Sequence, residues 1–201
     1  MQLSRKFKAF LSFNWHWYLI ILLSTILAFY YVFLALRTPG YDEQIQVFIA
    51  AKNVEKQSLE ESLYIGFEET KIKGIFIDNS DPYGSEFSII FNTRGTVNTD
   101  IIIMDDKYIN SGDYDIFFTG FTLDEITNYI SGDEELLYDT NGLIYGICVN
   151  RYLPEIESDE SMYLFFNKNS KKIGLLSEKS ENNYALLLLE NIVGRGKNEE
   201  K

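Results

Sequence analysis

The apolar stretch WHWYLIILLSTILAFYYVFLAL, residues 15–36, limits what this chain can fold into. From Trp17 to Leu36 it runs for 20 residues without a formal charge. At about 1.5 Å per residue, a helix of that length spans the roughly 30 Å hydrocarbon core of a bilayer. A single span has to be helical, because lipid offers no partner for free backbone N–H and C=O groups. The sequence therefore predicts one transmembrane helix over residues 15–37.

The charges on either side of this helix predict its orientation. Residues 1–14 carry three basic side chains and no acidic one, whereas Arg37 alone follows the helix, ahead of Asp42 and Glu43. Basic residues are retained on the cytoplasmic side of a membrane. We therefore expect a cytoplasmic N-terminus over 1–14, a single pass through the cell membrane, and an extracytoplasmic location for the bulk of the chain.

A secretory signal peptide is the competing interpretation of the same stretch. Signal peptides have shorter apolar regions, about 7–15 residues, and end in a small-x-small cleavage site. Here the run ends Leu34-Ala35-Leu36-Arg37, with bulky Leu36 between Ala35 and Arg37, so it does not form a small-x-small site. A lipid anchor would need a cysteine just past the run, but the one cysteine is Cys148. An uncleaved anchor is the expectation.

The charge of the remaining chain excludes some partners. Residues 38–201 hold 14 basic and all 30 acidic residues, a net charge of −16. Such a surface repels nucleic acid and anionic lipid, so we expect no nucleic-acid partner. The acidity indicates either a basic partner or cation, or simply the solvated surface of an exported bacterial domain. The length suits one domain with a core of its own.

Apolar and amphipathic segments alternate after a short linker at 38–44. Strands are expected where β-branched and aromatic residues cluster, and helices where apolar residues recur every three to four positions. The expected strands are 45–51, 71–77 and 99–104, and the expected helices are 54–64 and 83–92. This βαβαβ order predicts an α/β fold: one three-layer domain over 45–193 with a mainly parallel sheet.

The second half of the chain continues the pattern less regularly. Thr122 and Glu125 form a capping-box signature, which predicts a helix to about Ile130. The other expected elements are an extended piece at 116–120, strands at 142–149 and 162–167, a helix at 183–193 and a disordered charged tail at 194–201.

Three phrases occur in an order that resembles a known family. They are TDIII at 99–103, NGLIYGI at 141–147 and YLFFNKNS at 163–170. Over roughly 45–193 the chain resembles extracellular solute-binding proteins with the type II periplasmic-binding-protein fold, in which the third phrase leads towards a second lobe. Here about 30 residues follow Ser170, and Cys148 stands where the family has proline.

The resemblance implies a single lobe of such a protein, attached to the membrane. Two-lobed binders close around their ligand by hinge motion, and one lobe has no partner to close against. We therefore expect an accessory or interaction domain associated with a transporter, a sensor or another membrane protein. The alternative is direct binding of a small solute such as a carbohydrate.

No catalytic, cofactor or metal site is readable. His16, the one histidine, lies at the edge of the apolar helix, which excludes a Ser-His-Asp or histidine-metal site in the outer domain. No nucleotide-binding glycine pattern occurs, so no cofactor and no enzymatic activity are expected. Two acidic clusters lack the EF-hand spacing for Ca²⁺ and are expected to be solvated loops. They are Asp105, Asp106, Asp113 and Asp115, and Asp133, Glu134, Glu135 and Asp139.

Ligands of parallel sheets bind beyond the carboxyl ends of the strands. This rule nominates polar residues after the second and third strands and near the end of the second helix. They are Asp78, Asn79, Asp81, Arg94, Asp105 and Asp106. Tyr83 and Tyr145 are added because their rings could stack on a sugar. The alternative is that all eight are ordinary turn and strand residues.

Overall fold

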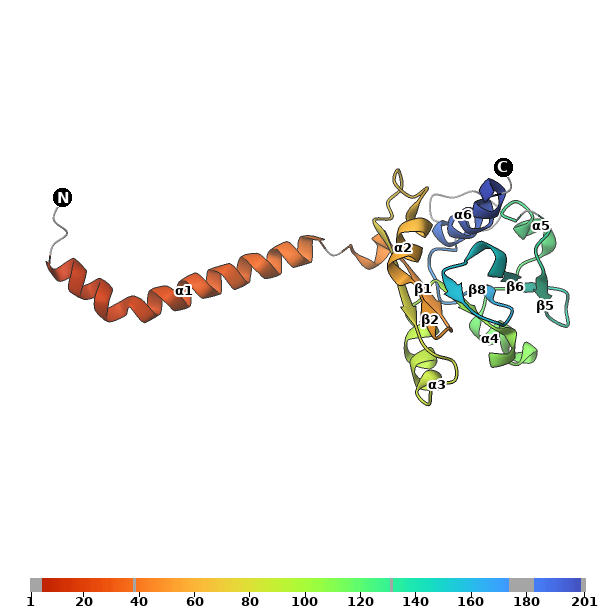
Figure 1. The fold of residues 1–201 in the computed structure, drawn as a ribbon, viewed down its shortest axis with the longest axis horizontal. Helices are drawn as coiled ribbons and strands as arrows, with labels where there is room; N and C mark the ends of the chain where they lie inside the picture. The colour runs from red at the N-terminus through yellow and green to blue at the C-terminus, as the bar shows by residue number, and fades with distance from the viewer. Residues whose placement is uncertain (1–4, 38, 131, 174–182, 200–201) are drawn as a thin grey trace. The chain divides into compact units, whose positions relative to one another are not determined.

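The computed structural model describes residues 5–37, 39–130, 132–173 and 183–199, and divides the chain into two compact units, Met1–Gly40 and Tyr41–Lys201 (Figure 1). The first unit contains one helix, α1 (Arg5–Arg37). Its segment Trp15–Leu34, 20 residues, is exposed throughout and is long and apolar enough to cross a membrane. A signal sequence meets the same criterion, so the helix is either a membrane span or a signal.

The second unit is an α/β fold built on a mixed sheet. Its strands are β1 (Gln44–Ile49), β2 (Asn53–Val54), β3 (Gly74–Asn79), β4 (Ile101–Met104), β5 (Leu136–Tyr138), β6 (Ile144–Cys148), β7 (Ile156–Glu157) and β8 (Tyr163–Phe166). Its helices are η1 (Tyr41–Glu43), α2 (Lys56–Tyr64), α3 (Phe87–Ile90), η2 (Phe91–Gly95), η3 (Asp106–Tyr108), η4 (Ser111–Asp113), α4 (Tyr114–Phe117), α5 (Leu123–Ile126), η5 (Asn150–Tyr152) and α6 (Tyr184–Glu199).

Six of the described strands form the main sheet in the order β3-β1-β4-β8-β6-β5. β1 pairs in parallel with both β3 and β4. β8 then pairs antiparallel with β4 and β6, and β5 pairs antiparallel with β6. The expected mainly parallel sheet therefore holds only for β3, β1 and β4. The remaining pairs are antiparallel, because β8 runs between two strands that point the opposite way, and the sheet as a whole is mixed.

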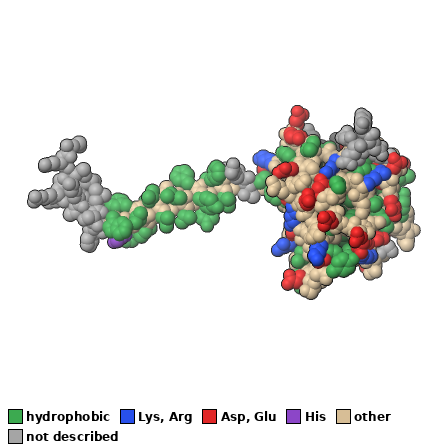
Figure 2. All heavy atoms as spheres, in the orientation of Figure 1, with side chains coloured by type: hydrophobic (Ala, Val, Ile, Leu, Met, Phe, Trp, Pro, Cys, Tyr) green, Lys and Arg blue, Asp and Glu red, His purple; other side chains and the backbone are tan. Residues whose placement is uncertain are grey.

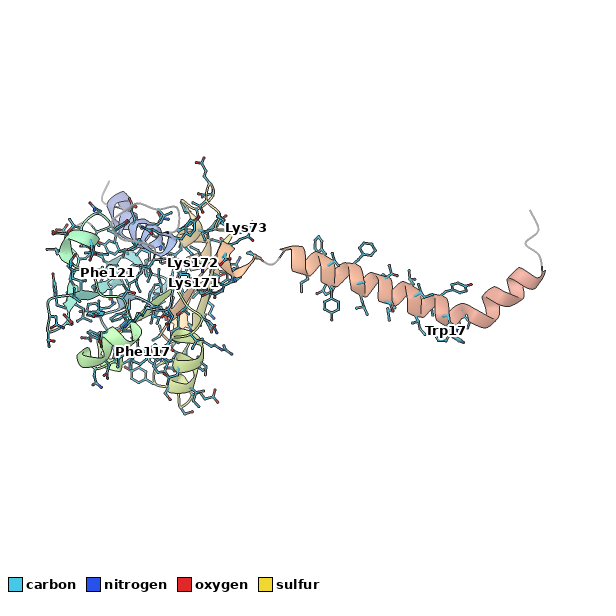
Figure 3. All side chains as sticks on the ribbon, turned by 180° about the vertical axis from the view of Figure 1, so that it is seen from behind. Trp17, Lys73, Phe117, Phe121, Lys171 and Lys172 are labelled. Carbon is cyan, nitrogen blue, oxygen red and sulfur yellow. The ribbon has the colours of Figure 1, made fainter. Side chains whose placement is uncertain are left out.

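Both faces of the sheet are covered, which explains why the central strands are apolar without interruption. α2 and α6 lie over one face, and α3 and α4 over the other (Figure 1). All four residues of β4 are buried, and its neighbour β1 alternates, with Val47 facing one cluster and Phe48 the other. Figure 3 shows Phe121 and Phe117, which belong to the clusters on opposite faces.

Several local predictions need correction. The helix expected at 83–92 is the short α3 followed by η2, and the extended piece expected at 116–120 begins instead with the last turn of α4. α5 ends at Ile126 rather than near Ile130, although Glu125 does accept hydrogen bonds from Thr122 N and Oγ1, both at 2.8 Å. α6 continues to Glu199, where a disordered tail from residue 194 was expected.

A buried ion pair lies at the amino ends of β1 and β4. The Asp100 side chain has no exposed surface, and its Oδ2 is 2.7 Å from the Nζ of Lys172, whose side chain is 7% exposed. Asp100 also accepts hydrogen bonds from Gln46 N at 2.9 Å and from Ser170 Oγ at 2.6 Å. The Lys172 ammonium lies 4.3 Å from the ring centroid of Tyr41. Asp100 therefore ties β1 to the segment that follows β8.

Replacing Lys172 by methionine should destabilise the α/β unit by about 3–5 kcal/mol, because it leaves the Asp100 carboxylate buried without a counter-charge. Urea unfolding followed by tyrosine circular dichroism measures this, since both tryptophans lie in α1. Lys73→Met is the matched control: Lys73 pairs with Glu43 at 2.5 Å but is 60% exposed, so its loss should cost at most about 1 kcal/mol. Equal effects for the two variants would contradict a structural role for the buried pair.

Candidate functional site

Four segments meet at the edge of the sheet where the parallel strands end. Residues 50–53 follow β1, residues 78–83 cover the end of β3 and the turn after it, residues 105–108 follow β4, and residues 155–160 lie between β6 and β8. We call these segments together the strand-end surface. Ligand sites of α/β sheets occur at this kind of edge.

The segment 155–160 reaches this edge by pairing with the chain beyond β1. β7 pairs antiparallel with β2, so that Glu157 lies opposite Asn53, and Asn53 Nδ2 donates to Glu157 Oε2 at 3.0 Å. At its other end Asn150 Nδ2 donates to Glu160 O at 2.7 Å. The segment is therefore fixed at both ends, and its acidic side chains lie beside the turn that follows β3.

The turn after β3 and the turn after β4 are each shaped by an aspartate. Asp81 Oδ1 accepts a hydrogen bond from Tyr83 N at 3.0 Å. Asp105 Oδ1 accepts one from Lys107 N at 2.9 Å and so caps η3. Such local side-chain-to-backbone bonds are typical of aspartate in turns. Asn79 Nδ2 donates to Ala51 O at 2.9 Å, which joins the ends of β3 and β1.

Two adjoining hollows lie in the strand-end surface and share Lys52 and Glu157. The smaller, about 190 Å³, is lined by Ala50, Ala51, Lys52, Asp81, Pro82, Tyr83, Glu157, Ser158, Asp159 and Glu160. The larger, about 380 Å³, is lined by Lys52, Asn53, Val54, Glu55, Asn79, Glu155 and Glu157. Lys52 is the one basic residue in either lining, so both hollows are acidic.

A cluster around Lys107 adjoins the smaller hollow. Lys107 Nζ contacts Glu160 Oε1 and lies 3.5 Å from Asp105 Oδ2 and 3.3 Å from the hydroxyl of Tyr83. The Tyr83 hydroxyl in turn donates to Glu160 Oε1 at 2.6 Å. Desolvation lowers the pKa of Lys107, but the Tyr83 hydrogen bond and the charge of Asp105 outweigh it, so the pKa lies above its ordinary value.

Asp106, next to this cluster, has a raised pKa. Desolvation is the main cause, followed by a side-chain hydrogen bond with Asp105 and the charge of Asp105. Ionised Asp106 is therefore disfavoured in the folded chain. Adjacent carboxylates that share a site shift one another in this direction.

The structure brings together some of the residues that the sequence nominated and separates others. Asn79, Asp81, Tyr83 and Asp105 lie at the strand-end surface, either lining the hollows or contacting Lys107. Asp106 begins η3 beside Asp105.

Two nominated residues pair with each other instead. Arg94 Nη1 lies 3.3 Å from Asp78 Oδ2, and Lys56 Nζ lies 4.0 Å from the same carboxylate. Neither Asp78 nor Arg94 lines a hollow. Exposed pairs of this kind contribute little to stability.

Tyr145 does not lie at the site, which corrects the prediction. It is 5% exposed within β6 and packs against the ring of Tyr114, with ring centroids 5.7 Å apart. A Cβ on Gly120 would come within 2.7 Å of the Tyr145 ring. Its ring is therefore part of the core and is closed to a ligand.

Sequence reasoning missed Lys52, Lys107, Glu157 and Glu160. Lys107 was accessible to the strand-end rule, since it follows β4 by three residues. Glu157 and Glu160 were not, because nothing local indicates that the acidic loop before β8 returns to the end of β1.

Within the described residues, no group of three or more His, Cys, Asp and Glu side chains is placed to hold a metal ion. Comparison with known protein families, with curated proteins and with solved structures finds no match. The class of the protein therefore rests on the structure: an α/β unit with a mixed six-stranded sheet, preceded by an apolar helix.

Asp106→Asn should raise the midpoint of thermal unfolding at pH 7. A raised pKa means that the folded chain binds the Asp106 proton more tightly than the unfolded chain, so ionisation at pH 7 destabilises the fold. Asparagine removes that penalty, and the gain should shrink as the pH falls towards the ordinary pKa of 3.8, below which both states hold the proton. Scans at pH 7 and pH 4.5 measure it. Exposed Asp159→Asn is the control, with a change within about 0.5 kcal/mol; a lower midpoint for Asp106→Asn at pH 7 would refute the explanation.

Proposed function

We propose that this chain is a single-pass membrane protein whose α/β unit lies outside the cytoplasm and acts as an accessory or interaction domain for a transporter, a sensor or another membrane protein. The segment Trp15–Leu34, exposed along its whole length, supports the anchor. The three basic residues ahead of it support a cytoplasmic N-terminus.

The architecture we propose for the α/β unit is that of one lobe of an extracellular solute-binding protein. β3, β1 and β4 form a parallel sheet with helices on both faces, as a three-layer lobe requires. Two of the three phrases that carry the resemblance meet in space, since Asp100 of the first accepts a hydrogen bond from Ser170 of the third. Lys172 also pairs with Asp100, so the segment that follows β8 is held against the sheet.

The main support for a role in protein interaction is that the strand-end surface is open and rich in charged side chains. Small-molecule pockets measure about 300–1,000 Å³ and are mostly apolar. Here the smaller hollow, about 190 Å³, falls below that range, and charged residues line both it and the larger hollow of about 380 Å³. Acidic side chains are spread over the visible face of the α/β unit (Figure 2). A surface of this kind suits contact with a basic face of another protein.

Direct binding of a carbohydrate is the second candidate, and one residue favours it. Tyr83 is 73% exposed and stands at the rim of the smaller hollow, beside Asp81 and Glu160. An exposed aromatic ring next to carboxylates can stack on a sugar while the carboxylates accept its hydroxyl groups. No catalytic step is proposed for either candidate.

The topology is tested by cysteine labelling in intact cells, in a Cys148→Ser background that removes the native thiol. Asp159→Cys should react with a membrane-impermeant maleimide, whereas Lys8→Cys should react only after lysis. The reverse pattern would refute the orientation. Mass spectrometry of the purified chain supplies the second test, because loss of the residues up to 37 would identify a cleaved signal peptide.

Photo-crosslinking separates the two candidate functions. A photoreactive residue at Asp81, in the strand-end surface, should crosslink the chain to a protein in its native membrane. The same residue at Val97, which is 59% exposed near the amino end of β4, should not. If the site binds sugar instead, Asp81 crosslinks no protein, and a sugar at 100 times its Kd adds about 2.7 kcal/mol, or about 5–10 °C in Tm. Tyr83→Ala should abolish that shift.

A further inference from the structure

The Lys107 side chain lies in a cage of two aromatic rings and two carboxylates. Its Nζ is 5.6 Å from the ring centroid of Tyr83 and 5.2 Å from that of Tyr108. The two rings meet edge to face, with centroids 6.4 Å apart. Ammonium groups are attracted to aromatic faces within about 6 Å. We call this set, with Asp105 and Glu160, the Lys107 cage.

The walls of the cage are held by bonds that do not involve Lys107's ammonium. Asp81 accepts from the backbone N–H of Tyr83, Asp105 caps η3, and Asn150 binds the backbone carbonyl of Glu160. The walls also come from three separate segments of the strand-end surface. These bonds fix the backbone of the walls, and the hydrogen bond from the Tyr83 hydroxyl to Glu160 Oε1 at 2.6 Å joins two wall side chains without the ammonium.

The ammonium itself is the exchangeable part. The Lys107 side chain is 42% exposed, whereas the side chains of Asp105 and Glu160 are 10% and 31% exposed. The cage thus has two partly desolvated carboxylates for one solvent-accessible cation. The hydroxyl of Tyr108 is buried and has no hydrogen-bond partner among the described residues.

We propose that this cage is a binding site for a primary ammonium group, specifically a lysine side chain of the partner protein, and that Lys107 occupies it as an internal competitor in the free chain. The partner is the one postulated above, so this inference rests on the proposed function. The acidic hollow alongside, with Asp81, Glu157 and Asp159 against Lys52, favours the approach of a basic segment.

Chemical rescue tests the cage on the full-length chain in detergent micelles. Lys107→Ala removes the side chain beyond Cβ, and n-propylammonium chloride supplies the missing atoms. The variant should lose about 2–4 °C in thermal midpoint, and propylammonium should restore it with a saturating dose dependence. Sodium chloride at equal ionic strength and 1-propanol should not. A flat response to propylammonium would overturn the proposal.

A matched control uses Lys56→Ala, which removes an ammonium that lies 4.0 Å from the Asp78 carboxylate. Propylammonium should not shift its midpoint beyond the sodium chloride effect. A saturating rescue of both variants would mean general charge compensation and would overturn the cage.

The internal-competitor role has its own measurement. Nα-acetyl-lysine N-methylamide, which mimics a lysine within a polypeptide, should bind Lys107→Ala at least about tenfold more tightly than the wild type. Rescue by propylammonium without binding of the lysine derivative would overturn the lysine partner and leave a site for small free amines only. If Lys107→Ala does not fold, propylammonium titrated into the wild type should shift the ring resonances of Tyr83 and Tyr108 with saturation; unchanged resonances would overturn the cage.

These probes need neither a membrane topology nor a partner protein. A failed rescue would thus remove the cage while the labelling and crosslinking results still stand. A reversed labelling pattern would remove the proposed function while a successful rescue still stands.

Discussion

The α/β unit depends on Asp100, a carboxylate with no exposed surface at the amino end of β4. It binds the backbone of β1 through Gln46 and the segment after β8 through Ser170 and Lys172. A buried ion pair adds little net stability compared with apolar side chains of the same shape, but the loss of one partner is costly. The pair therefore selects one conformation: the chain that leaves β8 has to turn back to Asp100 on its way to α6.

The two ends of the strands differ in how their polar groups are arranged. At the amino ends of the strands, around Asp100, the buried polar groups are hydrogen-bonded to one another. Asn167 adds hydrogen bonds from its Nδ2 to the carbonyls of Thr96 and Thr99, at 2.9 and 2.8 Å. At the carboxyl ends of the strands lie the two hollows, both lined in part by the acidic segment 155–160. Stability resides at one end of the strands, and solvent-accessible polar groups gather at the other. Ligand sites of α/β sheets lie at the carboxyl ends of the strands, which is the end that carries the hollows here.

The sequence was sufficient for those elements whose signal is local. β1 and β4 were predictable because continuous apolar runs indicate strands buried on both faces, and α2 because its leucines recur at helical spacing. β5 and β7 have three and two residues, too few to show a period. The antiparallel placement of β8 depends on its neighbours rather than on its own residues, so the sheet was expected to be more parallel than it is.

In the candidate site, too, only the residues with a local sequence signal were predictable. The strand-end rule selected Asp81 and Asp105 because each follows a recognisable strand, whereas Tyr83 was added because its ring could stack on a sugar. Tyr145 was added for the same reason and does not lie at the site, because in a strand buried on both faces the sequence does not show whether a tyrosine faces a ligand or the core. The Lys107 cage could not be predicted because its contacts are distant in sequence. Lys107 and Glu160 are separated by 53 positions, and Tyr83 and Glu160 by 77. Only the tertiary fold brings these residues together.

The lysine–carboxylate clusters around Lys172 and Lys107 differ in the solvent exposure of the lysine. Lys172 is 7% exposed beside Asp100, so water cannot replace it and its removal strands a buried charge. Lys107 is 42% exposed beside Asp105 and Glu160, so its ammonium can exchange with solvent at little cost to the fold. An arrangement of two rings and two carboxylates exceeds what a surface lysine needs for stability. Its geometry is accounted for if the cage recognises a cation, with Lys107 as the cation present in the free chain.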